Sequence, residues 1–133
     1  MSGKIALDTD VAIMFLNGNQ VIDAYLAKYA KVYLPVIVAG ELIFGALNSQ
    51  NVEENLARHR KLIQKSHVLQ VSTTTAETYA KTRLALKKKG KPIPENDLWI
   101  ASLCIENKIP LLSNDIHFDE VERLSVVHLA ING

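Results

Sequence analysis

Four acidic residues stand at positions where carboxylates could do chemistry. Asp8 ends the apolar run KIALD, Asp115 ends IPLLSND, and Asp97 opens the apolar segment LWI. Glu41 interrupts PVIVAGELIFGAL, in which nearly every neighbour is apolar. Because a buried glutamate without a partner is rare and costly, we expect Glu41 either to form a salt bridge or to face a polar cavity.

These acids also have structural alternatives. Asp97 lies in the first turn of a predicted helix, where an acid complements the helix dipole by roughly 0.3–1 kcal/mol and where Asn96 is a good N-cap. Asp10 is suited to be a helix-cap or turn residue before VAIMFL. The choice between structural and chemical roles depends on whether the acids meet in space.

Carboxylates that converge repel one another, so either their pKa values rise or a cation binds between them. Mg²⁺ and Mn²⁺ prefer such oxygen ligands. Zinc fits less well, because the only cysteine is Cys104 and the histidines show no metal-ligand spacing. We expect Cys104 to be an ordinary buried residue and the histidines to be structural or on the surface, although His117 lies two residues from Asp115. The four histidines are His59, His67, His117 and His128.

Short apolar runs and longer segments with helical spacing alternate along the chain. The predicted strands are residues 4–8, 31–35, 67–71, 109–115 and 125–130, and the predicted helices are residues 19–30, 36–48, 52–65, 74–89 and 96–107. This alternation predicts one α/β domain over residues 1–133 with a mostly parallel sheet. Ligands of such sheets collect beyond the carboxyl ends of the strands, where Asp8 and Asp115 would meet.

The composition excludes several classes of protein. Fifteen Lys and Arg against fourteen Asp and Glu give a net charge of +1, so no global field points to a nucleic-acid or membrane partner. No stretch approaches the roughly 18 apolar residues of a membrane span, and the N-terminus does not resemble a signal peptide. Together with the single cysteine, these features predict a cytoplasmic protein.

Two families with similar acids are disfavoured by particular residues. DTDVA resembles the nucleophile motif of haloacid-dehalogenase-like phosphatases, but Ala12 stands where that family has threonine. A phosphoacceptor receiver domain needs an aspartate at the end of a central strand and a lysine after a late one. The segments HVLQVS and LLSND supply neither.

The order of four motifs resembles PIN-domain nucleases, and more closely the VapC-type ribonuclease toxins of bacterial and archaeal toxin–antitoxin pairs. The motifs are LDTDV, AGELIFGA, ENDLWIAS and LLSNDIHFDEV, which span nearly the whole chain. The resemblance implies a PIN-like three-layer α/β/α fold and an endoribonuclease that depends on Mg²⁺ or Mn²⁺. It implies a catalytic quartet of Asp8, Glu41, Asp97 and Asp115, in which Asp8, Asp97 and Asp115 hold the metal.

The implied reaction is hydrolysis of an RNA phosphodiester bond, in which water attacks the phosphorus in line while the cation neutralises charge on the phosphate oxygens. Glu41 would orient the attacking water or complete the outer shell of the metal. Thr9 and Asn114 would support the metal ligands with hydrogen bonds. Asp10 departs from the asparagine or serine that is usual in the family, and Asp119 is expected to be an acid of a short helix rather than a ligand.

The segments on either side of Asp97 have their own expected roles. Trp99 and Ile100 would anchor its helix in the core. The basic residues before it either cap a helix that ends at Gly90 or form a phosphate-binding rim for RNA, and their position beside the acids favours the rim. These basic residues are Arg83, Lys87, Lys88, Lys89 and Lys91.

The resemblance also implies two protein partners. One is a cognate antitoxin, and the other is a second copy of the chain in a homodimer, through apolar residues of the early helices such as Ile13, Phe15 and Leu16. Two alternatives stay open: a PIN nuclease of RNA processing or decay, and a catalytically idle PIN-like module that only binds a protein or RNA. The presence of all four acids argues against the idle module.

Overall fold

The computed structural model describes residues 3–129, which contain a five-stranded parallel sheet. The strands are β1 (Lys4–Leu7), β2 (Lys31–Pro35), β3 (His67–Leu69), β4 (Leu111–Leu112) and β5 (Val126–Val127). All five predicted strands are confirmed, and most are shorter than the apolar runs that predicted them. Ala130, the last residue of the fifth predicted strand, lies outside the described residues.

The strand order places a topological switch point between β1 and β4. The order is β3-β2-β1-β4-β5, so the chain first builds outward from β1 and then returns to its other side. The two strands are parallel neighbours, with Leu7 opposite Leu112. Because the crossovers leave this point in opposite directions, it is the place where open α/β sheets form their ligand-binding crevice, at the carboxyl ends of the strands. Asp8 and Asp115 follow β1 and β4 at this edge.

Helices cover the sheet to give the three-layer α/β/α arrangement expected from the sequence. Within the described residues they are α1 (Thr9–Leu16), α2 (Gln20–Leu26), α3 (Val36–Leu47), α4 (Val52–Lys65), α5 (Thr73–Lys89), α6 (Glu95–Asn107) and the 3₁₀-helix η1 (Ile116–Glu120). The five predicted helices are confirmed, although the first ends at Leu26 rather than at residue 30.

Two predicted helix caps are wrong. Helix α1 begins at Thr9 and is capped by Asp8, so Asp10 lies inside its first turn. Helix α6 begins directly after Pro94, which places Asn96 inside the first turn as well. Both helices start earlier than expected because Asp8, with ψ of 162°, and Pro94, with ψ of 147°, already have the extended backbone of an N-cap.

The interior face of α6 forms much of the core. Ile100 is completely buried and Cys104 is 1% exposed, and burial raises the pKa of the Cys104 thiol to about 12. This cysteine is therefore the inert core residue that the sequence predicted. Trp99, also predicted to lie in the core, is only half-buried, because its ring turns toward α5 and stacks on Tyr79 with the ring centroids 4.0 Å apart.

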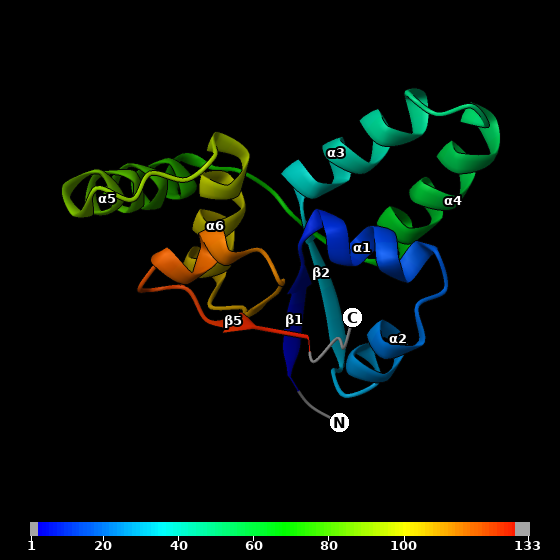
Figure 1. The fold of residues 1–133 in the computed structure, drawn as a ribbon, viewed down its shortest axis with the longest axis horizontal. Helices are drawn as coiled ribbons and strands as arrows, with labels where there is room; N and C mark the ends of the chain where they lie inside the picture. Colours follow the sequence, from blue (N-terminus) through cyan, green and yellow to red (C-terminus); the bar gives the residue numbers. More distant parts are fainter. Residues whose placement is uncertain (1–2, 130–133) are drawn as a thin grey trace.

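Two helix pairs flank the switch point. Helices α3 and α4 pack on each other and project from one side of the strands, while α5 and α6 pack on each other on the other side (Figure 1). Helices α3 and α6 also contact each other. The two pairs thereby carry Glu41 and Asp97 toward the same edge of the sheet. Among the described helices, none combines the length and apolar character that a membrane crossing requires.

Candidate active site

Asp8 is fixed by hydrogen bonds to both of its carboxylate oxygens. Its Oδ1 accepts from the Thr9 N–H at 2.8 Å, and its Oδ2 accepts from the Ser113 hydroxyl at 2.7 Å. The residue is only 6% exposed, and this burial raises the pKa of the Asp8 carboxyl, with further increases from Asp10 and Asp115. The hydrogen bonds from Ser113 and Thr9 lower it in part. Asp8 is thus a rigid, partly desolvated acid at the end of β1.

Ser113 joins Asp8 to Asp115. The Ser113 hydroxyl donates to Asp8 and accepts a 3.0 Å hydrogen bond from the Asp115 N–H, and the serine is completely buried. Asp115 in turn caps η1 by accepting from the His117 N–H at 2.9 Å. Sequence reasoning missed Ser113. Its only signal was a small polar residue directly after a buried strand, a position that polar residues often occupy for structural reasons.

Asp97 lies in the first turn of α6, within reach of Asp115 and His117. Burial raises the pKa of the Asp97 carboxyl to about 6, and repulsion from Asp115, Asp8 and Glu41 adds to the shift, whereas His117 opposes it. The His117 Nδ1 atom lies 3.6 Å from Asp97 Oδ2 and 3.1 Å from Asp115 Oδ1. One ligand atom of each of these three residues lies within 4.8 Å of the others.

Glu41 approaches the same cluster from α3. Burial raises the pKa of the Glu41 carboxyl, and the negative charges of Asp8 and Asp10 raise it further. Among the described residues Glu41 has no salt-bridge partner, and the polar groups that act on its carboxyl are Thr9, Asp8 and Asp10. The Thr9 hydroxyl is near enough to lower this pKa, yet Thr9 Oγ1 is buried and lacks a hydrogen bond of good geometry.

The other polar residues expected near the acids have different contacts. The Asn114 side-chain oxygen accepts a 2.7 Å hydrogen bond from the Leu129 N–H and so fastens the chain that follows β5. Asp10 is exposed on α1 and acts on Asp8 and Glu41 only through its charge. Asp119 lies in η1, as expected of a short-helix acid, and its carboxylate is 2.8 Å from His128 Nε2.

The basic residues at the end of α5 form a capped helix end, which was one of their two expected roles. Lys87, Lys88 and Lys89 occupy the last turn, and Gly90 follows in the left-handed conformation with φ of 72°. Lys89 reaches η1, where its Nζ lies 3.4 Å from the Glu120 carboxylate and also donates to the Glu120 carbonyl. Arg83 donates a 3.0 Å hydrogen bond to the Tyr79 hydroxyl, and Lys91 is exposed in the loop after the helix.

The residues gathered at this edge fit a hard divalent cation. The carboxylates come from separate elements, and Asp8, Glu41 and Asp115 each raise the pKa of a neighbouring acid, so a bound cation would relieve a repulsion built into the fold. Carboxylate oxygens are the ligands that Mg²⁺ and Mn²⁺ prefer. Ser113 donates to the Asp8 carboxylate and accepts from the Asp115 N–H. Such supporting hydrogen bonds are typical of metal ligands.

Comparison with known proteins agrees with this geometry. The PIN domain family model matches residues 5–124. Ribonuclease VapC1 of Haemophilus influenzae strain R2866 is 31% identical over 114 residues, covering 83% of this chain and 85% of that protein. The structure of VapBC-1 from nontypeable Haemophilus influenzae matches with a TM-score of 0.84 at 27% identity, over 94% of this chain and 97% of that one.

A further solved structure supports the same fold. VapBC2 from Rickettsia felis, bound to a DNA fragment from its promoter, matches with a TM-score of 0.88 at 24% identity, over 95% of this chain and 98% of that one. The family model covers most of the chain, and the relatives are matched over most of their own length. This chain belongs to the PIN-domain family, in its VapC ribonuclease branch.

Proposed function

We propose that this chain is a Mg²⁺- or Mn²⁺-dependent endoribonuclease and the toxin of a toxin–antitoxin pair. The observation that carries the proposal is the convergence of Asp8, Asp97 and Asp115, with Glu41 beside them, at the switch point of the sheet. Relatives named as VapC ribonucleases support the choice of RNA as substrate. We propose that the enzyme acts on RNA in the cytoplasm.

Asp8, Asp97 and Asp115 would hold the cation. When bound, it would supply Lewis-acid stabilisation of the charge on the phosphate oxygens. Ser113 keeps Asp8 in one orientation by its hydrogen bond. Glu41, whose pKa is raised by burial, would orient the attacking water and accept its proton. Since water is the nucleophile, the RNA 2′-hydroxyl is not consumed, and preference for RNA depends on recognition.

The fold leaves His117 beside two of the proposed ligands. Its Nδ1 atom lies 3.1 Å from Asp115 Oδ1 and 3.6 Å from Asp97 Oδ2, so it can pair with Asp115 or join both carboxylates around a cation. We assign it a supporting role, because hard cations prefer oxygen ligands to imidazole nitrogen and the His117 side chain is 49% exposed. Thr9 supports Asp8 through its backbone N–H, whereas the Asn114 side-chain oxygen accepts from the Leu129 N–H, which leaves the Asn114 amide nitrogen for the proposed support of a metal ligand.

The protein partners follow from the relatives. Several structural neighbours are VapBC complexes, and VapBC-5 from Mycobacterium tuberculosis is described as a member of a toxin–antitoxin family. We therefore propose a cognate antitoxin for this chain. The test is to look for a small gene adjacent to the one that encodes this chain, to express it, and to measure whether its product binds the purified chain and stops RNA cleavage.

A homodimer remains a second proposed assembly. Of the apolar residues expected at its face, Ile13 is 40% exposed, whereas Phe15 and Leu16 are half-buried against the core. Phe44 and Leu47 on α3 are more exposed, at 68% and 56%. Sedimentation of wild type and of Phe44→Ser would show whether α3 contributes to a dimer.

The deciding experiment for catalysis is direct. The purified protein is incubated with a mixed-sequence fluorogenic RNA in Mg²⁺, in Mn²⁺ or in EDTA, alongside Asp97→Asn. We expect cleavage only with a metal ion and only by wild type. An idle binding module would bind the RNA without cleaving it, and a nuclease of RNA processing would cleave but would be insensitive to the product of the adjacent gene.

A further inference from the structure

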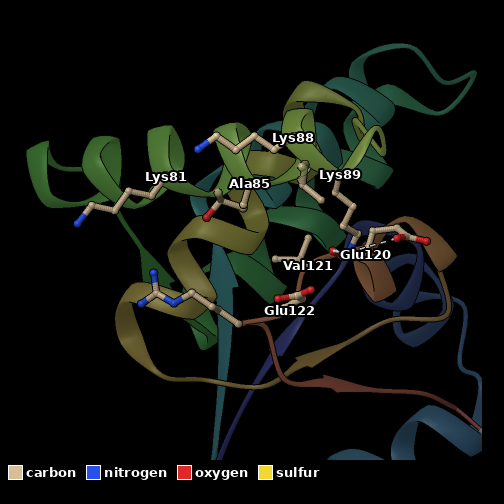
Figure 2. Close-up of a pocket in the computed structure, with 10 residues that line it drawn as sticks. Lys81, Ala85, Lys88, Lys89, Glu120, Val121 and Glu122 are labelled. Carbon is tan, nitrogen blue, oxygen red and sulfur yellow. Dashed lines mark hydrogen bonds and ion pairs between the residues drawn. The ribbon is translucent and has the colours of Figure 1, made fainter.

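A pocket of about 400 Å³ lies on the face of the molecule formed by α5 and the chain after η1 (Figure 2). The second half of α5 forms one wall, and residues 120–123 form the other. Its volume is in the range of about 300–1,000 Å³ that is usual for small-ligand sites. None of Asp8, Glu41, Asp97 and Asp115 lines it, so the pocket is distinct from the acidic cluster.

The pocket has an apolar floor. Leu86 of α5 and Val121 opposite it are 3% and 5% exposed, and Ala85 lies beside them on the helix. Thr82 is 7% exposed, and its hydroxyl donates a hydrogen bond to the Thr78 carbonyl within α5. A flat apolar group can therefore rest here without leaving a buried donor unpaired.

The rim is cationic. Lys81 and Lys88 extend from α5 to the same side of the pocket, while Lys89 turns away to meet Glu120 (Figure 2). Arg123 supplies a third cation from the opposite wall. Within residues 3–129, Lys81, Lys88 and Arg123 form no ion pair with a carboxylate. Their charges are available to an anion.

An acceptor accompanies these cations. Glu122 lines the pocket, and among residues 3–129 it too lacks an ion-pair partner. A carboxylate can only accept hydrogen bonds, so it repels another carboxylate but pairs with an N–H group. A ligand for this pocket therefore needs an anionic group, a flat apolar body and N–H donors at once.

The acidic cluster and the pocket share η1. Asp115 and His117 stand at the beginning of this short helix, and Glu120, which Lys89 holds, stands at its end. Five residue steps of about 2 Å each separate Asp115 from Glu120, or roughly 10 Å. A polynucleotide held at the acidic cluster would reach the pocket within a few nucleotides.

We propose that this pocket binds one nucleotide of the RNA strand that flanks the cleaved bond. Its base lies on Leu86 and Val121 and donates an N–H to Glu122, while its phosphate is bound by Lys81, Lys88 and Arg123. This inference rests on the proposed ribonuclease function, and names a subsite that helps to position its substrate. An acidic peptide is disfavoured because it has no flat base to lie on the floor with an N–H group directed to Glu122.

Two variants separate a built pocket from general surface charge. Lys81→Gln/Lys88→Gln/Arg123→Gln removes the free cations, and Ala85→Trp fills the floor while leaving every charge in place. All four positions are exposed, so both proteins should fold, which thermal melts would verify. Lys61→Gln/Lys65→Gln, at exposed lysines of α4 outside the pocket, is the matched control.

Binding is measured by fluorescence anisotropy with fluorescein-labelled single-stranded 12-mers of A, C, G and U, in EDTA to prevent cleavage, over a range of salt concentrations. The triple variant should raise Kd at least about tenfold and should flatten the salt slope by about 0.7 for each lost contact. Ala85→Trp should raise Kd about tenfold for at least one of the four RNAs with an unchanged salt slope. The control should match wild type in both respects.

Three results would overturn the proposal. In the first, both pocket variants bind the RNAs with the Kd of wild type. In the second, the Lys61/Lys65 control loses as much RNA affinity as the pocket variants. In the third, the triple variant keeps its affinity for RNA but loses affinity for an oligoglutamate peptide. Failure of the proposed ribonuclease function would look different, because wild type would then bind the 12-mers through this pocket but would cleave no RNA with Mg²⁺ or Mn²⁺. Where cleavage is present, the triple variant should raise KM and leave kcat close to wild type.

Discussion

The acidic cluster and the basic pocket lie at opposite ends of η1 and use charge in opposite ways. At the cluster, Asp8 is 6% exposed and is fixed by two hydrogen bonds, so its charge is partly desolvated and strongly coupled to its neighbours. At the pocket, Lys81 and Lys88 are exposed to solvent. Fixed, desolvated charges suit chemistry, which requires defined geometry, whereas exposed cations suit a strand that must bind and leave.

The largest effect should follow from removing charge at the acidic cluster. Asp8→Asn and Asp97→Asn should each lower RNA cleavage by at least about a hundredfold, because each removes a proposed metal ligand without removing core volume. Initial rates on a fluorogenic RNA in Mn²⁺ measure this. Asp23→Asn, an exposed acid in the first turn of α2, is the control and should cleave normally. Normal cleavage by a folded Asp8 or Asp97 variant would reject the assigned site.

The coupling among the acids should appear next in stability. Without metal, Asp97→Asn should raise the melting temperature by about 2–8 °C at pH 7.5, because it relieves repulsion. With metal at a hundredfold excess over Kd, wild type gains about 2.7 kcal/mol of stability and the variant gains little. The difference between their melting temperatures should therefore narrow or change sign. Calorimetry in EDTA and in Mn²⁺ tests this. An equal, modest loss of stability in both conditions would identify Asp97 as a helix-dipole acid only.

The Asp97 carboxyl should also make the stability of the protein depend on pH. Its pKa is raised from 3.8 to about 6 on folding, so the folded state retains the proton where the unfolded state has lost it. The resulting stabilisation is complete below pH 3.8 and is lost as the pH rises through about 6. In EDTA, wild type should therefore lose more stability than Asp97→Asn between about pH 4 and pH 6. If the stability of the two proteins changed with pH in parallel, the raised pKa of Asp97 would be contradicted.

A smaller effect is expected from the hydroxyl that joins two acids. Ser113→Ala removes the donor to Asp8 and the acceptor for the Asp115 N–H, and should weaken Mn²⁺ binding by about 10–100-fold. Isothermal titration measures this affinity. Ser102→Ala is a matched control, because Ser102 is equally buried but bonds only to the Leu98 carbonyl. Equal affinities in the two variants would show that Ser113 serves folding alone.

The smallest effect should come from the contact between the two regions. Lys89 and Glu120 have side chains 33% and 37% exposed, so their ion pair should contribute about 0–1 kcal/mol to stability. A double-mutant cycle with Lys89→Gln and Glu120→Gln, measured by denaturant unfolding, gives the coupling. A coupling well above this range would show that the end of η1 is held far more rigidly than a surface pair allows.

Local sequence patterns were sufficient to predict most strands and helices and the acids at their ends. Apolar runs of the right length marked each strand, and the spacing of apolar residues marked each long helix, because both depend on neighbours a few positions away. The same logic picked out Glu41 as an acid inside an apolar helix. It was less reliable at helix ends, where the backbone geometry of Asp8 and Pro94 moved the caps away from Asp10 and Asn96.

The sequence by itself thus determined the five strands and five of the helices, though not their ends, and which acids stand near their boundaries; α1 (Thr9–Leu16) was not among the predicted helices. Only the tertiary structure decided which polar groups meet. Ser113 bonds to Asp8 across 105 positions because β1 and β4 pair in one register. His117 turns toward Asp97, and Arg123 faces Lys81 and Lys88 across the pocket. Such contacts depend on how distant elements pack, and no pattern among neighbouring residues encodes that packing.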